Sequence, residues 1–395
     1  MRIGLVLPEA PQYSETFFNL KIQGLKESGF DVILFTGSKN KKKSDLEIRS
    51  EYPVRKGNVF IQAFLYAYVL MKSFLFSPKR TLNLLKLESE DGKNFKECLK
   101  SVYINAHIFP EDIDILHFGF TTMALKRENT AKSMNALMSV SFRGYDINIY
   151  PLKNPGCYKK VWENTDKVHT ISEYLRGKAV KYGLSENTPY KKITPAVDPD
   201  KFPQSEIRKE ISVPVILTVG RLNWIKNYET AISAMKMLAD DGVNFKYTIV
   251  GEGPETERLK FAVYQLGLRD KIIFAGKKSH DEVKDLMSKT DIYLQPSFEE
   301  GFCVSVLEAQ AAGLMCIVSD AEGLKENIID GKTGWIIAKR DFRSFKNKIK
   351  DVMEMNYERR KEISDNARSR IINEFKAEEQ KKYFKEFFET MTKKA

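Results

Sequence analysis

The segment Ser297-Phe-Glu-Glu-Gly-Phe-Cys-Val-Ser-Val-Leu-Glu-Ala-Gln-Ala-Ala-Gly313 follows directly on the apolar run Ile292 to Gln295. The run predicts a buried strand, and a helix is expected from about Val304. The loop between them is short and contains Gly301. Strand, short loop and helix in this order are typical of the βαβ units that build a parallel sheet.

The same junction predicts an anion-binding site. Free backbone N–H groups and the positive end of the helix dipole face the loop. Glu300 lies in the loop and Glu308 lies about two turns along the helix. The two carboxylates are therefore expected to contact different parts of one bound ligand. A carboxylate accepts hydrogen bonds from two adjacent hydroxyls at once, which suits the diol of a ribose or a hexose.

Two further loops after predicted strands carry matching chemistry. In Thr218-Val-Gly-Arg-Leu-Asn-Trp-Ile-Lys-Asn227, Arg221 and Lys226 are a turn apart and can converge on one diphosphate. In Val250-Gly-Glu-Gly-Pro-Glu255, the glycines allow close approach of the backbone, and Pro254 is expected at the first position of a helix. No GxGxxG sequence follows the first strand, which argues against a nicotinamide enzyme.

Apolar strand-like runs alternate with helical patterns along the 395 residues, and the alternation starts afresh in the second half. We therefore expect an α/β protein with two Rossmann-like, doubly wound domains, residues 1–200 and 201–375. A charged helix with aromatic residues at helical spacing is expected at 376–395. The predicted strands are Ile3 to Leu7, Asp31 to Phe35, Ile115 to Phe118, Met138 to Phe142, Val168 to Ile171, Val215 to Val219, Tyr247 to Val250, Ile272 to Ala275 and Ile292 to Gln295, with helices at Thr16 to Glu27 and Tyr228 to Ala239.

Three motifs together resemble, in order and spacing, the retaining glycosyltransferases of family four, which have the GT-B fold. They are the Arg221/Lys226 pair, the Gly251-Glu-Gly-Pro254 turn and the Glu300-x7-Glu308 motif. The likeness extends over most of the chain, through Ser172-Glu-Tyr-Leu, Ile193-Thr-Pro-Ala-Val-Asp198 and Asp330-Gly-Lys-Thr-Gly334. The first loop, Ser14-Glu-Thr-Phe17, is similar to the subgroup that builds colanic acid and other exopolysaccharides or capsules. The resemblance implies two domains that face a cleft, with the last helix returning to the N-terminal domain.

The resemblance also implies roles for single residues. Arg221 and Lys226 would bind the donor diphosphate, Glu308 the nucleotide ribose, and Glu300 the transferred sugar. The other expected donor contacts are Gly220, Gly251, Gly253, Pro254 and Val304, and the N–H groups of Gly301, Phe302 and Cys303. The implied reaction is retaining transfer of a hexosyl group from a UDP-, GDP- or ADP-sugar to a glycan or polyprenyl-linked acceptor in surface polysaccharide synthesis. It would need neither metal nor cofactor, because the nucleotide-sugar is a substrate.

The N-terminal half departs from the family pattern at Arg143, in Val140-Ser-Phe-Arg-Gly-Tyr-Asp146, where a histidine usually touches the donor sugar. Arginine recognises carboxylate or phosphate through two parallel bonds, so one interpretation is an acidic sugar or a phosphate in the donor or acceptor. The other is a bond from Arg143 to a sugar hydroxyl, or a pair with Asp146. Candidate contacts on the acceptor or sugar side are Ser14, Glu15, Thr16, Asp146 and His117. His117 lies at the end of a predicted strand, so a purely structural role is the alternative for this histidine.

The charge composition limits the classes of partner that the protein is expected to bind. The net charge is +11, and the first 200 residues hold 30 Lys or Arg against 22 Asp or Glu. A basic half favours phospholipid or nucleic acid, and no zinc-finger, RRM or KH signature supports nucleic acid. The spacing of the cysteines and histidines predicts neither disulfides nor a zinc site. Asp112-Ile-Asp114 is interpreted as a loop before a strand. The short apolar start lacks the features of a secretory signal, so a cytoplasmic protein is expected.

The segment Val59 to Ser77 suggests contact with a membrane. Val59 to Met71 is apolar except for Gln62, which is shorter than the roughly 20 residues that a spanning helix requires. Lys72 follows, and basic residues flank both sides: Arg55, Lys56, Lys79 and Arg80. This pattern suits a helix in the headgroup region of an anionic membrane surface, at the inner face of the cell membrane. The alternative is a core or interdomain helix.

Other functions remain open at this stage. A nucleotide-sugar epimerase or a phosphorylase on the same fold would keep a similar site. A non-enzymatic basic protein that binds membrane would explain the charge, but it would leave the Glu300 and Arg221 motifs without a purpose.

Overall fold

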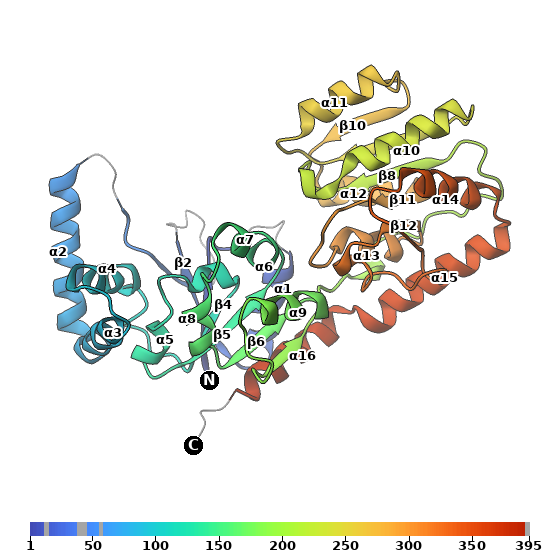
Figure 1. Ribbon diagram of the computed structural model, residues 1–395. Helices are drawn as coiled ribbons and strands as arrows, with labels where there is room; N and C mark the ends of the chain where they lie inside the picture. The colour runs from blue at the N-terminus through green and yellow to red at the C-terminus, as the bar shows by residue number, and fades with distance from the viewer. Residues whose placement is uncertain (12–15, 38–45, 55–57, 392–395) are drawn as a thin grey trace. The chain divides into compact units, whose positions relative to one another are not determined.

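The computed structural model describes residues 1–11, 16–37, 46–54 and 58–391. Two α/β units make up the chain (Figure 1). The first comprises Met1–Ile193 together with Lys381–Ala395, and the second comprises Thr194–Gln380. The sequence predicts transitions near residues 200 and 376, whereas the two units divide after Ile193 and after Gln380.

The first unit is built on a seven-stranded parallel sheet in the order β3-β2-β1-β4-β5-β6-β7. The strands are β1 (Arg2–Leu7), β2 (Asp31–Thr36), β3 (Glu47–Ser50), β4 (Ile115–Phe118), β5 (Leu137–Phe142), β6 (Lys167–Thr170) and β7 (Tyr190–Lys192). Helices cover both faces of the sheet, so successive residues of the central strands β1, β4 and β5 are buried on both faces. In β1, for example, Ile3 pairs with Val32 on one side and with Ile115 on the other, and all three side chains are buried.

The helices of the first unit are α1 (Thr16–Glu27), α2 (Val59–Phe76), α3 (Pro78–Glu90), α4 (Phe95–Asn105), α5 (Thr130–Ser133), α6 (Tyr145–Asn148), α7 (Tyr150–Lys153), α8 (Lys159–Asn164), α9 (Glu173–Lys181) and α16 (Ala377–Glu389). Helices α3 and α4 were not predicted, although both begin with clear start signals. Pro78 opens α3, and Asn94 and Glu97 form a capping box at the start of α4.

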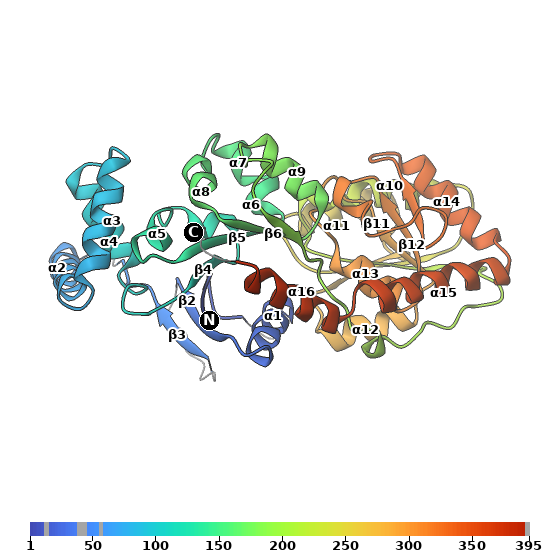
Figure 2. The same ribbon diagram turned by 90° about the horizontal axis from the view of Figure 1, so that it is seen from below.

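The last helix, α16, packs into the first unit, as predicted (Figure 2). Its residues Phe384, Phe387 and Phe388 are at most 1% exposed, and they join Phe18 and Ile22 of α1 in one hydrophobic core. The aromatic stripe at helical spacing is buried in this core, and that burial stabilises a helix whose other side chains are mostly charged.

The second unit carries a six-stranded parallel sheet in the order β10-β9-β8-β11-β12-β13. The strands are β8 (Val215–Val219), β9 (Lys246–Val250), β10 (Ile272–Gly276), β11 (Ile292–Gln295), β12 (Met315–Ser319) and β13 (Trp335–Ile337), of which the last two were not predicted. The chain builds outward from β8 in one direction and then returns to place β11 on its other side. The strand order therefore reverses between β8 and β11, and ligands of such sheets bind beside the carboxyl ends of the strands at that point.

The helices of the second unit are α10 (Tyr228–Asp240), α11 (Thr256–Gln265), α12 (His280–Ser288), α13 (Val304–Ala311), α14 (Phe342–Glu354) and α15 (Tyr357–Glu374). Helix α13 begins at the predicted residue. The prediction for Pro254 is wrong, because α11 begins two residues later, at Thr256. The Thr256 hydroxyl bonds both the carbonyl and the N–H of Gly253, so the turn satisfies its own polar groups before the helix starts.

Candidate active site

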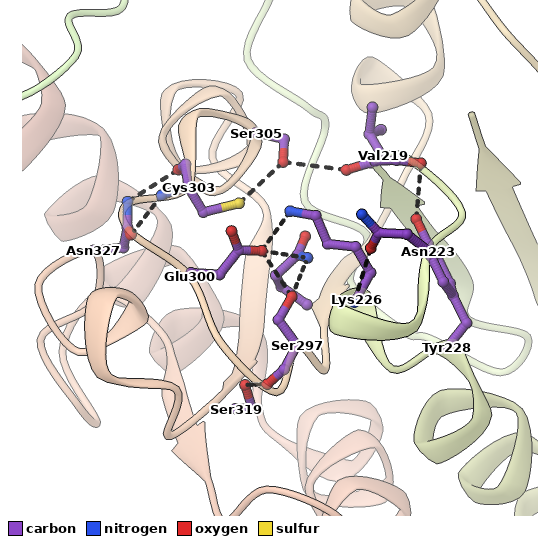
Figure 3. Close-up of polar contacts among 12 residues, drawn as sticks. Val219, Asn223, Lys226, Tyr228, Ser297, Glu300, Cys303, Ser305, Ser319 and Asn327 are labelled. Carbon is purple, nitrogen blue, oxygen red and sulfur yellow. Dashed lines mark hydrogen bonds and ion pairs between the residues drawn. The ribbon is translucent and has the colours of Figure 1, made fainter. Parts of the chain in front are cut away.

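The loops that follow β8 and β11 meet at the reversal point of the second sheet (Figure 3). The loop after β8 contains Gly220, Arg221 and a short 3-10 turn, η3 (Trp224–Lys226). The loop after β11 leads from Pro296 into α13. Hydrogen bonds hold the loops together: the Phe298 N–H donates to the Ile225 carbonyl at 2.7 Å.

Lys226 and Glu300 form an ion pair between these loops (Figure 3). The Lys226 ammonium donates to Oε1 of Glu300, and the side chains are 19% and 10% exposed. The same oxygen accepts from the Ser297 hydroxyl at 2.8 Å and from the Gln295 amide at 3.4 Å. Burial disfavours the charge on Lys226, but the attraction of Glu300 outweighs it, and the pKa of Lys226 is raised. Lys226 therefore keeps its positive charge in this partly buried position.

Two asparagines fix the position of Lys226. The Asn223 side chain accepts from the Lys226 N–H at 3.3 Å. Asn227 has a left-handed backbone, with φ of 52°, and its side chain donates to the Pro296 carbonyl at 2.9 Å. Asparagine tolerates this conformation better than most residues, so the turn aims Lys226 toward Glu300 at little conformational cost.

The glycines of the loop after β9 lie against the loop after β8. A Cβ atom on Gly251 would stand 2.0 Å from the Gly220 carbonyl oxygen, and one on Gly253 would stand 2.2 Å from the Leu222 carbonyl oxygen. Gly251 also has a φ of +136°, which side-chain-bearing residues rarely adopt. In this structure these glycines permit contact between the two loops, and Gly220 is positioned by them.

Glu308 lies on α13, and its side chain is 15% exposed. Burial raises the pKa of this carboxyl to about 7, and the attraction of Lys284 opposes that shift. The His280 ring lies 3.9 Å away, and burial lowers the pKa of that histidine. Glu308 is therefore poised to exchange a proton near neutral pH.

The N-terminal end of α13 only partly matches the predicted anion site. The Cys303 N–H already donates to the Asn327 side chain at 3.1 Å, and the Asn327 amide donates back to the Cys303 carbonyl at 3.0 Å. This N–H is therefore already satisfied within the protein. Gly301 and Phe302 are buried, and Val304 and Arg221 are exposed.

The first unit holds Arg143 and Asp146 in the turn after β5. The Arg143 guanidinium lies over the Phe17 ring of α1, 3.0 Å from its centroid. Asp146 is buried, and its carboxylate accepts the N–H groups of Thr121, Arg143 and Gly144 at 2.8 to 3.2 Å. Burial raises the pKa of Asp146, and these donors act against the shift. Asp146 therefore shapes the turn that presents Arg143.

The structure places His117 inside the core of the first unit, so a direct contact with ligand is not its role there. Its side chain is fully buried, 2.6 Å from the Lys21 ammonium and within 2.9 Å of the hydroxyls of Ser139 and Ser141. It also packs against Phe388 of α16. Burial and the nearby Lys21 hold the pKa of His117 well below its ordinary value. A neutral, structural histidine results.

Other sequence candidates fall elsewhere. Ser14 and Glu15 lie outside the described residues, and of Thr16 only the backbone, at the start of α1, is described. Asp112 pairs with Arg80, while Asp114 accepts the Arg2 N–H, as suits a loop that leads into β4. Among the residues that the structure describes, there is no group of three or more His, Cys, Asp or Glu that could hold a metal ion.

Sequence reasoning missed several residues that support Glu300. Gln295 and Ser297 were inside the quoted motif, but nothing in their spacing marked them as partners of the carboxylate. Asn327 and Gly323 come from a distant loop; a Cβ atom on Gly323 would stand 2.2 Å from the Glu300 carbonyl oxygen. Only the fold brings that loop to the site.

Comparisons with known proteins match the second unit to a family and the whole chain to named relatives. Residues 200–370 match the family of glycosyl transferases group 1. The putative colanic acid biosynthesis glycosyltransferase WcaL of Escherichia coli is 24% identical over 95% of this chain and 96% of its own length. The amylovoran biosynthesis glycosyltransferase AmsK of Erwinia amylovora is 25% identical over 86% of this chain and 88% of its own length.

Solved structures show the same architecture over the whole chain. The crystal structure of HepE from Anabaena in complex with UDP and glucose has a TM-score of 0.72 and 15% identity, and the match covers 99% of this chain and 100% of that one. A sucrose-phosphate synthase from Thermosynechococcus elongatus matches with a TM-score of 0.71, over 98% of both chains, at 16% identity. The second unit therefore matches the family of glycosyl transferases group 1, and the chain is a glycosyltransferase with the GT-B fold.

Proposed function

We propose that this enzyme transfers a hexosyl group, with retention of configuration and without a metal, from a nucleotide-sugar to a glycan or lipid-linked acceptor. The observation that carries the proposal is the Lys226–Glu300 ion pair at the reversal point of the second sheet, with Arg221 in the same loop as Lys226 and Glu308 on the helix that follows Glu300. Two cations and two carboxylates are thereby available to one ligand that contains both phosphates and hydroxyls.

Each of the four residues has a proposed task. Arg221 and Lys226 stabilise the negative charge that develops on the departing nucleoside diphosphate, which is the charge that a metal ion would otherwise neutralise. Glu300 already uses Oε1 for three contacts within the protein, so Oε2 accepts hydroxyls of the transferred sugar. Glu308 in its ionised form accepts both hydroxyls of the ribose.

The named relatives support the substrate class. HepE was crystallised with UDP-glucose, which favours a nucleotide-sugar donor here, of UDP, GDP or ADP type. WcaL and AmsK are named for the synthesis of colanic acid and amylovoran, which favours a place in surface polysaccharide synthesis.

A thermal-shift screen with UDP-, GDP- and ADP-sugars tests the donor. A ligand at about 100 times its dissociation constant adds about 2.7 kcal/mol to the free energy of unfolding, so the correct donor should stand out. The Arg221→Ala variant serves as the control, since it should lose most of the shift. A screen in which no nucleotide-sugar stabilises the protein would contradict the proposal.

Product analysis then tests the reaction. Transfer that depends on an acceptor, gives the same anomeric configuration as the donor by NMR, and continues in EDTA supports the proposal. Inversion of configuration, or activity that EDTA abolishes, would refute those parts of it. An epimerised donor formed without acceptor would identify an epimerase, and a requirement for phosphate would identify a phosphorylase.

A further inference from the structure

Helix α2 exposes most of its apolar surface. It is one continuous helix across Lys72, it contains no acidic residue, and only Val69 and Ser73 are buried. Phe60, Phe64 and Phe76 are 88%, 77% and 74% exposed. The interpretation of this segment as a core helix is therefore wrong. Apolar surface of this extent is unusual on a protein that meets only water.

One side of α2 is attached to the protein. The Tyr66 ring stacks on Tyr103 of α4, and the Ser73 hydroxyl bonds Thr81 of α3 at 2.7 Å. Figure 1 shows α3 and α4 along one side of α2, whose opposite side is uncovered by the described chain. We call this uncovered side, which carries Phe60, Phe64, Met71 and Leu75, the α2 face.

By length and composition alone, the whole helix α2 could cross a membrane. In the sequence, the shorter run Val59 to Met71 is by itself too short to do so. Its attachment argues against that arrangement. Helices α3 and α4 carry exposed charges such as Lys86, Lys96 and Lys100, and a spanning α2 would draw them into hydrocarbon. Charges at that depth are strongly unfavourable. A helix that lies in the plane of the interface buries the α2 face and leaves these charges at the headgroups.

The charge around the α2 face selects one kind of partner. Residues 58–105 contain seven Lys or Arg and four Asp or Glu. The acidic side chains are engaged: Glu88 pairs with Lys93, Asp91 with Lys160, and Glu97 caps α4. Among the residues that the structure describes, Lys79, Lys96 and Lys100 form no ion pair. An apolar face beside such cations fits anionic lipid, whereas a second copy of this chain would bring like charges together.

We propose that the α2 face docks this enzyme onto an anionic lipid bilayer, such as the cytoplasmic leaflet of a cell membrane. The proposal goes beyond sugar transfer, because it concerns a surface that contains none of the donor-site residues. A lipid-linked acceptor would meet an enzyme that is held at the same surface.

Vesicle flotation of the full chain tests the proposal. We expect at least about tenfold more protein on vesicles of phosphatidylglycerol mixed with phosphatidylcholine than on phosphatidylcholine alone, and loss of binding in high salt. Phe60→Glu with Phe64→Glu should abolish flotation. The matched control, Phe261→Glu with Tyr264→Glu, changes two aromatic residues of α11 that are 59% and 58% exposed, and it should float like the wild type.

A depth measurement separates the two arrangements of the helix. Tryptophan fluorescence of the Phe64→Trp variant should be quenched by lipids brominated near the glycerol backbone more than by lipids brominated near the chain end. The reverse order would indicate insertion to the centre of the bilayer and would overturn the in-plane arrangement.

Two other outcomes would overturn the proposal. The first is that the protein does not bind anionic vesicles at low salt. The second is that sedimentation shows a dimer of the wild type and a monomer of the Phe60→Glu, Phe64→Glu variant, while neither protein binds vesicles. The thermal shift with donor should be equal in the wild type and in this variant. An equal shift together with lost flotation separates membrane docking from the proposed sugar transfer.

Discussion

Lys226 and Glu300 connect the loop after β8 to the loop after β11 through an ion pair that is largely shielded from water. The two residues are 74 positions apart in the chain. If one partner is removed, the other remains as a buried charge without compensation. The pair therefore contributes to the stability of the second unit as well as to its proposed chemistry.

Loop residues commonly tolerate substitution without loss of the fold, but the ion pair makes these two positions exceptions. We now expect Lys226→Met and Glu300→Gln each to lower the free energy of unfolding by about 2–4 kcal/mol, somewhat less than for a fully buried pair. The double variant should lose less than the sum of the two, while all three lose transfer. Urea denaturation of the four proteins measures the coupling, and additive losses would contradict it.

Arg221 offers the opposite case, because its side chain is exposed. Arg221→Ala should reduce transfer by about 2–4 kcal/mol in transition-state free energy, as for other electrostatic donors, with the urea midpoint unchanged. Arg269→Ala is the matched control, since Arg269 is an exposed arginine that precedes β10, near the other end of the strands. Normal turnover of the Arg221 variant would remove Arg221 from the site.

Glu308 should make donor binding depend on pH. Its pKa of about 7 means that the acid is mostly protonated at low pH and becomes the better acceptor as pH rises. We expect the affinity for donor, measured by titration calorimetry, to increase between pH about 6 and about 8. Glu308→Gln should bind more weakly and without this dependence. An unchanged pH profile in the variant would assign the titration to another group.

The same shift predicts a stability effect of definite sign. The carboxyl titrates near its ordinary pKa of 4.5 in the unfolded chain and near 7 in the folded one. Between these values the folded state binds the extra proton, so its stability is greatest below pH 4.5 and declines until pH 7. The decline attributable to Glu308 should be at most about 3 kcal/mol. Denaturation of Glu308→Gln alongside the wild type measures it as a difference of slopes.

Gly251 and Gly267 form a matched pair for the contact between loops. Both have positive φ, but a Cβ atom would meet the Gly220 carbonyl at 2.0 Å in the first case and nothing within 4 Å in the second. Gly267→Ala should cost about 1–2 kcal/mol from backbone strain alone. Gly251→Ala should lower stability further and weaken donor binding, because the Gly220 loop must move. If Gly251→Ala and Gly267→Ala changed the free energy of unfolding and the donor thermal shift equally, the contact between the two loops would be unimportant.

Arg143 tests the hypothesis of an acidic ligand. Its guanidinium lies over Phe17, an arrangement that lysine does not reproduce. If the enzyme recognises an acidic sugar or a phosphate there, Arg143→Lys should lower transfer by about tenfold or more, since the bidentate contact is lost. Arg143→His should shift preference toward neutral sugars. Full activity of the lysine variant with neutral sugars would reject the acidic ligand.

Most of the fold could be predicted from local patterns. The apolar runs of β1, β8 and β11 and the restart of the alternation imply two parallel sheets, because a strand that is apolar on both faces must be covered on both faces. The prediction missed strands β3, β7, β12 and β13 and several helices, among them α3, α4, α12, α14 and α15, since short strands and single caps are weak signals by themselves. The motif residues around Glu300 and Lys226 also stood out by type and spacing.

The sequence by itself thus determined the two α/β domains, the returning helix and the loops that carry the charged residues. Tertiary structure alone decided which of these residues touch. It pairs Lys226 with Glu300, commits the Cys303 N–H to Asn327, and encloses His117 beside Lys21. It also leaves α2 exposed, although its composition is that of a core helix. Burial and pairing depend on contacts between segments that are distant in the chain, and a local sequence pattern does not show which distant segments meet.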